Sequence, residues 1–300
     1  MEAFKGTQLL EFIDKFKNNE DCYRYLLEHK WGKGYSCFKC GHTTCIKGKK
    51  WYYKRCQKCN YNESATANSL FHKLKFPILK AFHILFKYST KKKGMSSYEI
   101  ASEFGINQKT AWAYHQRIQV AMKSTEKHIL KGEVDVDEFV VGGPEKGKQG
   151  RSDSSKNKII LAVEILPNGK MGQAYAQCIE DYSEKSIRPF MESRIDKNSV
   201  IKTDGFSTYK AMKKDFKKLR QYKSDMGKNF PEIHVLIMNF KSWLRGIHHK
   251  CEYPYMQRYI DEFFYRFNRR SNRNSIFNNL FERFMNSKPL MISGLRELND

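Results

Sequence analysis

The chain has 300 residues, 40% of them hydrophobic and 14% aromatic, so it can form two or three domains with real cores and is not of a disordered composition. Its 55 Lys and Arg residues against 32 Asp and Glu give a net charge of +23, which predicts a polyanionic partner such as nucleic acid. No apolar run reaches the roughly 18–20 residues needed to cross a bilayer, and the first residues do not resemble a signal peptide, so we expect no membrane partner, a cytoplasmic location and cysteines that are reduced or bind metal.

Residues 1–30 are predicted to form an N-terminal helical segment. Apolar residues recur there at helical spacing, from Leu9 to Phe16 and again from Cys22 to Leu27. We expect this segment to serve packing, with Cys22 as a small buried residue.

Four cysteines have the spacing of a zinc ribbon, which we place at residues 31–72. Cys37 and Cys40 form one Cys-x-x-Cys pair, and Cys56 and Cys59 form a second. Two such pairs can close a tetrahedral site of four thiolates on two hairpin turns. Cys45 lies at no ligand spacing. Because four protein ligands leave no open position, the predicted Zn²⁺ is structural.

The hairpin between the cysteine pairs mixes basic and aromatic residues. This pattern suits a phosphate backbone, although a solvated hairpin would have the same composition. The predicted DNA contacts in it are Lys49, Lys50, Lys54 and Arg55.

Residues 73–130 are predicted to be a helical, helix-turn-helix-like DNA-binding region. An apolar helix runs from about 76 to 89. A second helix begins near Ser97, a turn follows at Gly105, and a third helix is capped near Asn107. A plain helical hairpin is the alternative. The predicted DNA contacts are Gln108, Lys109, Thr110 and Arg117.

Residues 131–290 are predicted to be an α/β domain with an RNase H-like mixed sheet flanked by helices. An acidic strand ends at Gly142-Gly143, and a polar loop over 144–158 follows it. Two strands at 159–165 and 171–179, a helix over 183–195 and a strand ending at Asp204 come next. The basic stretch 213–228 is predicted to be a loop, and a helix covers 231–246.

Acidic residues at the ends of two of these strands indicate a metal site. Asp135, Asp137 and Glu138 crowd the first strand, and Asp204 ends the later one. Burial of a carboxylate is costly unless it is paired or binds a metal. Alternation along a strand puts Asp135 and Asp137 on one face and Glu138 on the other, so it excludes Glu138 but does not separate the two aspartates.

The helix over 231–246 offers two candidates for a third ligand. His234 and Lys241 lie two turns apart on nearly one face, and Glu232 and Asn239 form a second pair at the same spacing. Helical geometry alone does not choose between His234 and Asn239.

The chain resembles bacterial insertion-sequence transposases of the ISXO-like group, which join a zinc ribbon to an RNase H-like domain with a DDE-type site. The resemblance covers about residues 20–290. It rests on the four cysteines and on the segments 136–143, 203–205, 241–249 and 259–270.

The resemblance implies that Asp137 and Asp204 are carboxylate ligands for catalytic Mg²⁺ or Mn²⁺. Relatives with Glu as the third residue have Lys seven positions later, then Gly and His, and this places His234 in the Glu position and Lys241 on substrate phosphate. An imidazole is a poorer ligand for Mg²⁺ than a carboxylate, and Asn239 remains the rival.

The resemblance also implies double-stranded DNA as the partner, both transposon ends and target, with His248 and His249 as further DNA contacts. It implies a homo-oligomer assembled on DNA, associated with a bacterial nucleoid. The expected function is metal-dependent DNA strand cleavage and strand transfer. The alternatives are a zinc-ribbon and helix-turn-helix regulator with an inactive transposase-derived domain, or a structure-specific nuclease.

Overall fold

The computed structural model describes residues 3–124, 128–142, 156–223, 225, 229–248 and 253–290. The chain divides into two compact units: residues 1–122 with 271–300, here called unit 1, and residues 123–270, called unit 2. Gly143, His249 and most of the predicted loop over 144–158 lie outside the described residues.

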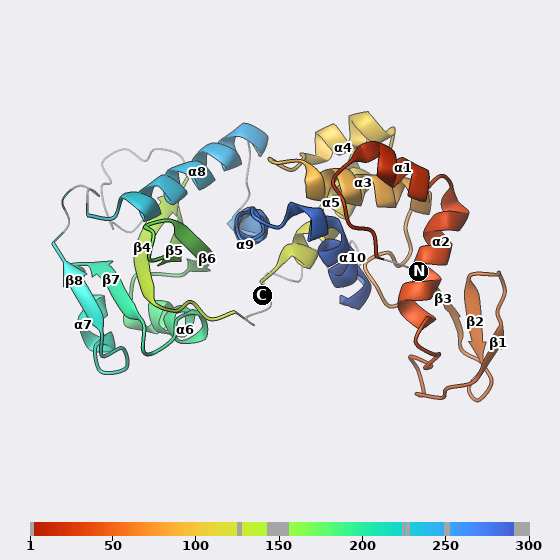
Figure 1. Cartoon of the computed structure of the whole chain (residues 1–300), viewed down its shortest axis with the longest axis horizontal. Helices are drawn as coiled ribbons and strands as arrows, with labels where there is room; N and C mark the ends of the chain where they lie inside the picture. Colours follow the sequence, from red (N-terminus) through yellow and green to blue (C-terminus); the bar gives the residue numbers. More distant parts are fainter. Residues whose placement is uncertain are drawn as a thin grey trace. The chain divides into compact units, whose positions relative to one another are not determined.

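Unit 1 contains six α-helices and a small sheet within its described part. The predicted N-terminal helical segment forms two helices, because the chain leaves the helix at Phe16 and Asn18 caps a new one with a reciprocal pair of hydrogen bonds to Asp21. The elements are α1 (Leu9–Lys15), α2 (Asn19–Trp31), β1 (Cys45–Lys47), β2 (Tyr53–Cys56), β3 (Asn62–Ser64), α3 (Ile78–Thr90), α4 (Ser97–Phe104), α5 (Gln108–Met122), the 3₁₀ helix η2 (Arg273–Ser275) and α10 (Ile276–Asn286) (Figure 1).

Helices α4 and α5 meet at the predicted helix-turn-helix turn. Ser96 caps the start of α4, and Gly105 ends that helix in the left-handed conformation at a φ of 56°, which glycine adopts without steric cost. The side chain of Asn107 accepts a hydrogen bond from the backbone of Lys109 at 2.9 Å and begins α5.

Aromatic side chains form the core of unit 1. Phe12 stacks on Phe86 at 4.1 Å between ring centroids, and Phe277 of α10 meets Phe12 edge-on at 5.1 Å. Phe281, one turn later, packs 5.6 Å from Phe82. The catalytic domain was predicted to extend to residue 290 and so to contain the residues of α10. These aromatic contacts instead include α10 in unit 1.

Unit 2 is built on a five-stranded mixed sheet of order β6-β5-β4-β7-β8. The pairs β4–β5 and β5–β6 are antiparallel, and β4–β7 and β7–β8 are parallel. This is the RNase H-like arrangement expected. The elements are β4 (Glu133–Val141), β5 (Asn157–Ile165), β6 (Met171–Ile179), α6 (Glu184–Arg194), β7 (Val200–Asp204), α7 (Thr208–Met212), β8 (Leu219–Tyr222), α8 (Pro231–Ile247), the 3₁₀ helix η1 (Tyr253–Tyr255) and α9 (Met256–Phe267) (Figure 1).

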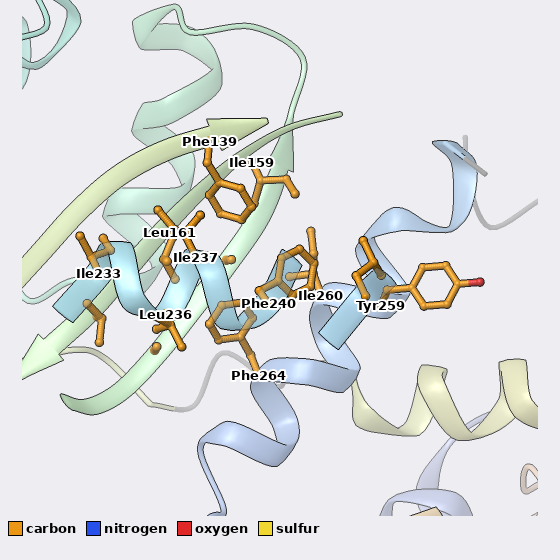
Figure 2. Close-up of a cluster of buried hydrophobic side chains, with 14 of the residues drawn as sticks. Phe139, Ile159, Leu161, Ile233, Leu236, Ile237, Phe240, Tyr259, Ile260 and Phe264 are labelled. Atoms are coloured by element: carbon orange, nitrogen blue, oxygen red, sulfur yellow. The ribbon is translucent and has the colours of Figure 1, made fainter. Parts of the chain in front are cut away.

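Each face of this sheet is covered by helices. One face packs on α8 and α9, where Phe240 lies between Phe139 of β4 and Phe264 of α9 (Figure 2). The other face packs on α6 and α7, with Val136 and Tyr209 in the same buried cluster. The candidate active site lies on the face of the sheet that α8 covers.

One strand was missed by the sequence analysis. Residues 219–222, predicted as part of a basic loop, form the edge strand β8 and pair in parallel with β7. Leu219 is buried, whereas Arg220 and Tyr222 are exposed. Charged side chains on an edge strand prevent unwanted pairing, and they also hide the alternating pattern of a half-buried strand.

Within the described residues, no helix has the length and apolarity required to cross a membrane.

Candidate active site and zinc site

Asp137 and Asp204 lie on two neighbouring parallel strands. The backbone ladder sets Asp135 of β4 opposite Lys202 of β7 and ends there, two residues before Asp137 and Asp204. Side chains alternate along a strand, so both carboxylates point to the face covered by α8, the face of Phe139.

Asp137 lies in the middle of β4, whereas Asp204 is the last residue of β7 and begins a turn. Oδ1 of Asp137 accepts the backbone N–H of Glu138 at 2.9 Å, and Oδ1 of Asp204 accepts the N–H of Phe206 at 3.0 Å. The side chain of Gln221 in β8 donates to the carbonyl of Phe206 at 2.8 Å and braces the turn after Asp204. Gln221 was not predicted from the sequence, because β8 was predicted as part of a loop.

His234 is the residue of α8 that reaches this pair. Its Nε2 lies 3.7 Å from Oδ2 of Asp137. The side chain of His234 is 43% exposed and that of Asp137 is 19% exposed, so both remain open to solvent and to a substrate. Helix α8 is fixed in this orientation because Ile233, Leu236 and Ile237 point onto the sheet (Figure 2).

Lys241 lies two turns further along α8, on the same face. Its Nζ is 5.4 Å from the centre of the Phe139 ring, two residues beyond Asp137 on β4. Partial burial lowers the pKa of Lys241, the nearby positive charge of Arg245 lowers it further, and Asp137 acts in the opposite direction. A cation held here lies within reach of an anion bound at the carboxylates.

Asn239, the rival third residue, is exposed on α8. Val235, one turn earlier on the same face of the helix, is 51% exposed, which marks this side of α8 as an outer one. The residues that α8 turns toward the sheet are Ile233, Leu236, Ile237 and Phe240. The structure therefore brings His234, and not Asn239, next to Asp137.

The neighbouring acidic residues differ from Asp137 in their surroundings. Glu138 points to the opposite face, as alternation predicts, and accepts a hydrogen bond from the hydroxyl of Tyr209 in α7. Asp135 is only 4% exposed, and no partner is found among the described residues for its Oδ1. Burial, helped by Glu133 and Glu232 and opposed by Lys202, raises the pKa of Asp135 to about 6.

The donor set of Asp137, Asp204 and His234 fits a hard divalent cation. Two carboxylates from neighbouring strands offer the oxygen ligands that Mg²⁺ and Mn²⁺ prefer, and their partial exposure leaves room for water or phosphate oxygens. His234 adds a nitrogen donor on one side. The residues that would hold such ions are thus Asp137, Asp204 and His234.

The four predicted cysteine ligands form one cluster in unit 1. Their sulfur atoms all lie within 4.8 Å of one another. Sγ of Cys37 is 3.6 Å from Sγ of Cys59, and Sγ of Cys40 is 3.7 Å from Sγ of Cys56. Tetrahedral Zn–S bonds of about 2.3 Å require sulfur atoms about 3.8 Å apart, so the cluster fits zinc.

Each cysteine pair lies on a tight turn of the expected kind. Gly41 and Asn60 adopt positive φ angles of 73° and 58°, and their N–H groups donate back to the carbonyls of Cys37 and Cys56. Burial raises the pKa of the Cys37 thiol, but the backbone N–H groups of Cys40 and Lys39 outweigh this effect and set it at about 6. The first turn therefore favours the thiolate at Cys37, the form that zinc requires.

Most of the predicted DNA-contacting side chains lie at the surface. Lys49, Lys50 and Lys109 are exposed, and Gln108 and Thr110 are half-buried. Arg55 is exposed and donates to the side chain of Asn60, whereas Lys54 lies over the ring of Trp31 at 5.1 Å.

Two predicted DNA contacts are wrong. Arg117 is 8% exposed and donates to the carbonyls of Leu70 and His72 at 2.8 and 2.9 Å, so it ties α5 to the chain after the ribbon. His248 is 9% exposed and packs between Trp243 and Tyr259, with ring centroids 5.3 and 4.5 Å away. The other predicted histidine contact, His249, lies outside the described residues.

Comparison with known proteins gives one family match. The family described as "ISXO2-like transposase domain" matches residues 129–268, which span the sheet of unit 2, α8 and α9. Among solved structures, "Crystal structure of the Mos1 Strand Transfer Complex" matches with a TM-score of 0.31 and 10% identity, over 67% of this chain and 74% of that chain. No curated protein matches the chain.

Proposed function

Because residues 129–268 belong to the ISXO2-like transposase domain family, we propose that this chain is a DNA transposase that binds the ends of its element and carries out metal-dependent strand cleavage and strand transfer. The observation that supports this most strongly is that Asp137 and Asp204, on two neighbouring parallel strands, point to the same face of the sheet, together with the 3.7 Å approach of His234 to Asp137. Metal-dependent phosphoryl transfer needs such a constellation, whereas a purely DNA-binding domain does not.

The chemistry divides between the ions and the protein. When bound, divalent ions supply an activated hydroxyl nucleophile and neutralise charge on the phosphate oxygens. Asp137 and Asp204 hold and orient the reacting groups from two neighbouring strands of the sheet. His234 completes the donor set through its ring nitrogen, and Lys241 contacts a phosphate oxygen of the DNA. Asp135 remains outside the donor set, because it is buried two residues deeper on β4.

The central test is strand transfer with the element's own terminal sequences, in Mg²⁺ and in Mn²⁺. Cleavage at the element end followed by joining to a target duplex supports the proposal. End binding without cleavage in either metal would instead identify a DNA-binding regulator that has lost the reaction.

The third ligand can be tested with one pair of variants on α8. His234→Ala is expected to lower the cleavage rate by at least about 10²-fold, because a metal ligand contributes several kcal/mol to the transition state. Asn239→Ala, the matched control on the outer side of the same helix, is expected to change the rate less than about twofold. Rates are compared in single-turnover assays at saturating metal. A larger loss for Asn239→Ala than for His234→Ala would exchange the two roles.

DNA binding is expected to depend steeply on salt. A chain of charge +23 that neutralises about 6–10 phosphates should lose roughly 10³–10⁵ in affinity between 50 and 200 mM salt. Fluorescence anisotropy with an end duplex over this range measures the slope. A flat response would mean that the positive charge serves another purpose.

A further inference from the structure

The tip of the ribbon hairpin carries an ordered group of aromatic rings. Tyr23 of α2 stacks on Tyr52 with ring centroids 3.9 Å apart and planes 9° from parallel. Trp51 lies 6.1 Å from Tyr23 and 5.5 Å from Tyr52, at 86° to both rings. The three rings thus form one rigid group in unit 1.

These distances fix how Trp51 is placed. An indole at the end of the stack would be about one stacking distance closer to one tyrosine than to the other, but its two distances differ by only 0.6 Å. The indole therefore lies alongside the stack, with its plane nearly perpendicular to both tyrosine rings. Trp51 remains 43% exposed, so part of its ring system is accessible to a partner.

The surroundings of Trp51 are strongly positive. Residues 31–62 contain eight Lys and Arg residues and no Asp or Glu. Lys49 and Lys50 directly precede Trp51 and are exposed, and Nζ of Lys50 lies 5.8 Å from the centre of the Tyr52 ring. A partner of this surface must carry negative charge next to a flat apolar group. Nucleic acid offers both, as phosphates and base faces.

We propose that the hairpin tip is a base-contacting element, in which Trp51 stacks on an unpaired nucleobase of the element-end duplex while Lys49 and Lys50 contact the flanking phosphates. This inference rests on the proposed function, since it takes the end duplex as the partner. It adds a specific role to the ribbon, because phosphate contacts alone give affinity without reading or opening the base pairs. Tyr23 and Tyr52 support the indole.

The experiment compares three DNA probes: the element-end duplex, the same duplex with two mismatched base pairs at its terminus, and one of its single strands. Affinities for the full-length, zinc-loaded protein are measured over a salt series. We expect the wild type to prefer the mismatched duplex. Trp51→Ala should weaken that complex roughly 5- to 150-fold, the effect of removing one stacked base, with an unchanged salt slope.

Lys50→Ala is the matched control. It should reduce the slope of log affinity against log salt by about 0.9 and keep the mismatch preference, since it removes one phosphate contact and no base contact. Bound zinc is measured in every variant. Trp51→Leu, which fills the space beside the tyrosines without an aromatic face, should behave as Trp51→Ala does and guards against a loosened ribbon.

Three results would overturn the inference: a mismatch preference that survives in both Trp51 variants, a salt slope that falls in them as in Lys50→Ala, or an effect confined to the single strand. Failure of the wild type to bind any end duplex would be a different outcome, because it would overturn the proposed function itself.

Discussion

Asp137→Asn and Asp204→Asn are each expected to abolish strand cleavage while end binding stays near the wild-type level. Each change removes a carboxylate charge and one ligand oxygen, but keeps the size of the side chain. Loss of several kcal/mol of transition-state stabilisation corresponds to at least about 10³-fold in rate. Binding should be unchanged or slightly tighter, because a carboxylate that repels phosphate is gone. Cleavage of labelled end duplexes and anisotropy measure the two quantities separately.

Two neighbouring acids provide the controls. Glu138→Gln changes the opposite face of the same strand, where Tyr209 donates to this carboxylate, and Asp135→Asn changes the buried position two residues earlier. Both variants should retain measurable cleavage. Cleavage that persists in Asp137→Asn would end the carboxylate-pair hypothesis. Complete loss in Asp135→Asn, with the fold intact, would show that Asp135 is the ligand.

The double variant Cys37→Ser with Cys40→Ser is expected to lose its zinc and to unfold the ribbon. Structural zinc in small sites contributes about 10–16 kcal/mol of apparent binding free energy. The apolar cluster of the ribbon is small: among the described residues, its buried members are Trp31, Tyr35, Cys37 and Cys56. The fold of the ribbon therefore depends on the metal. Bound zinc should fall to background, and limited proteolysis should cut within residues 31–72.

Cys45→Ser serves as the control for this variant. Cys45 is a half-buried cysteine on β1 of the ribbon, outside the four-sulfur cluster. The Cys45→Ser variant should keep its full zinc content, and its ribbon should resist proteolysis. The zinc assignment fails if the double variant also binds zinc stoichiometrically. End binding should be lost in the double variant, whereas unit 2 should stay folded.

Strands β4 to β7 could be predicted because they are rich in apolar residues and lie between turn or loop segments. Strand β8 could not, since Arg220 and Tyr222 are exposed on an edge strand and only Leu219 is buried. Its existence depends on pairing with β7, a contact between distant parts of the chain. The break between α1 and α2 was missed for a different reason: the apolar spacing continues across it, and the cap at Asn18 is a local signal that overrides this spacing.

The candidate site was predictable in its residue types and less so in its geometry. The alternation of β4 separated Glu138 from Asp137, but only the placement of α8 on the sheet distinguishes His234 from Asn239. Arg117 was predicted to contact DNA as part of the second helix of the helix-turn-helix, and His248 because of the family resemblance. Burial of such side chains depends on tertiary partners, here the carbonyls of Leu70 and His72 and the rings of Trp243 and Tyr259.

The inclusion of α10 in unit 1 has a consequence for the order of events during synthesis. Phe12, Phe82 and Phe86 are made early, yet their partners Phe277 and Phe281 emerge only after all of unit 2 has left the ribosome. The aromatic core of the first unit therefore closes last. A chain interrupted after residue 270 can still complete the sheet that carries Asp137 and Asp204, while the unit that holds the zinc ribbon lacks its final helix.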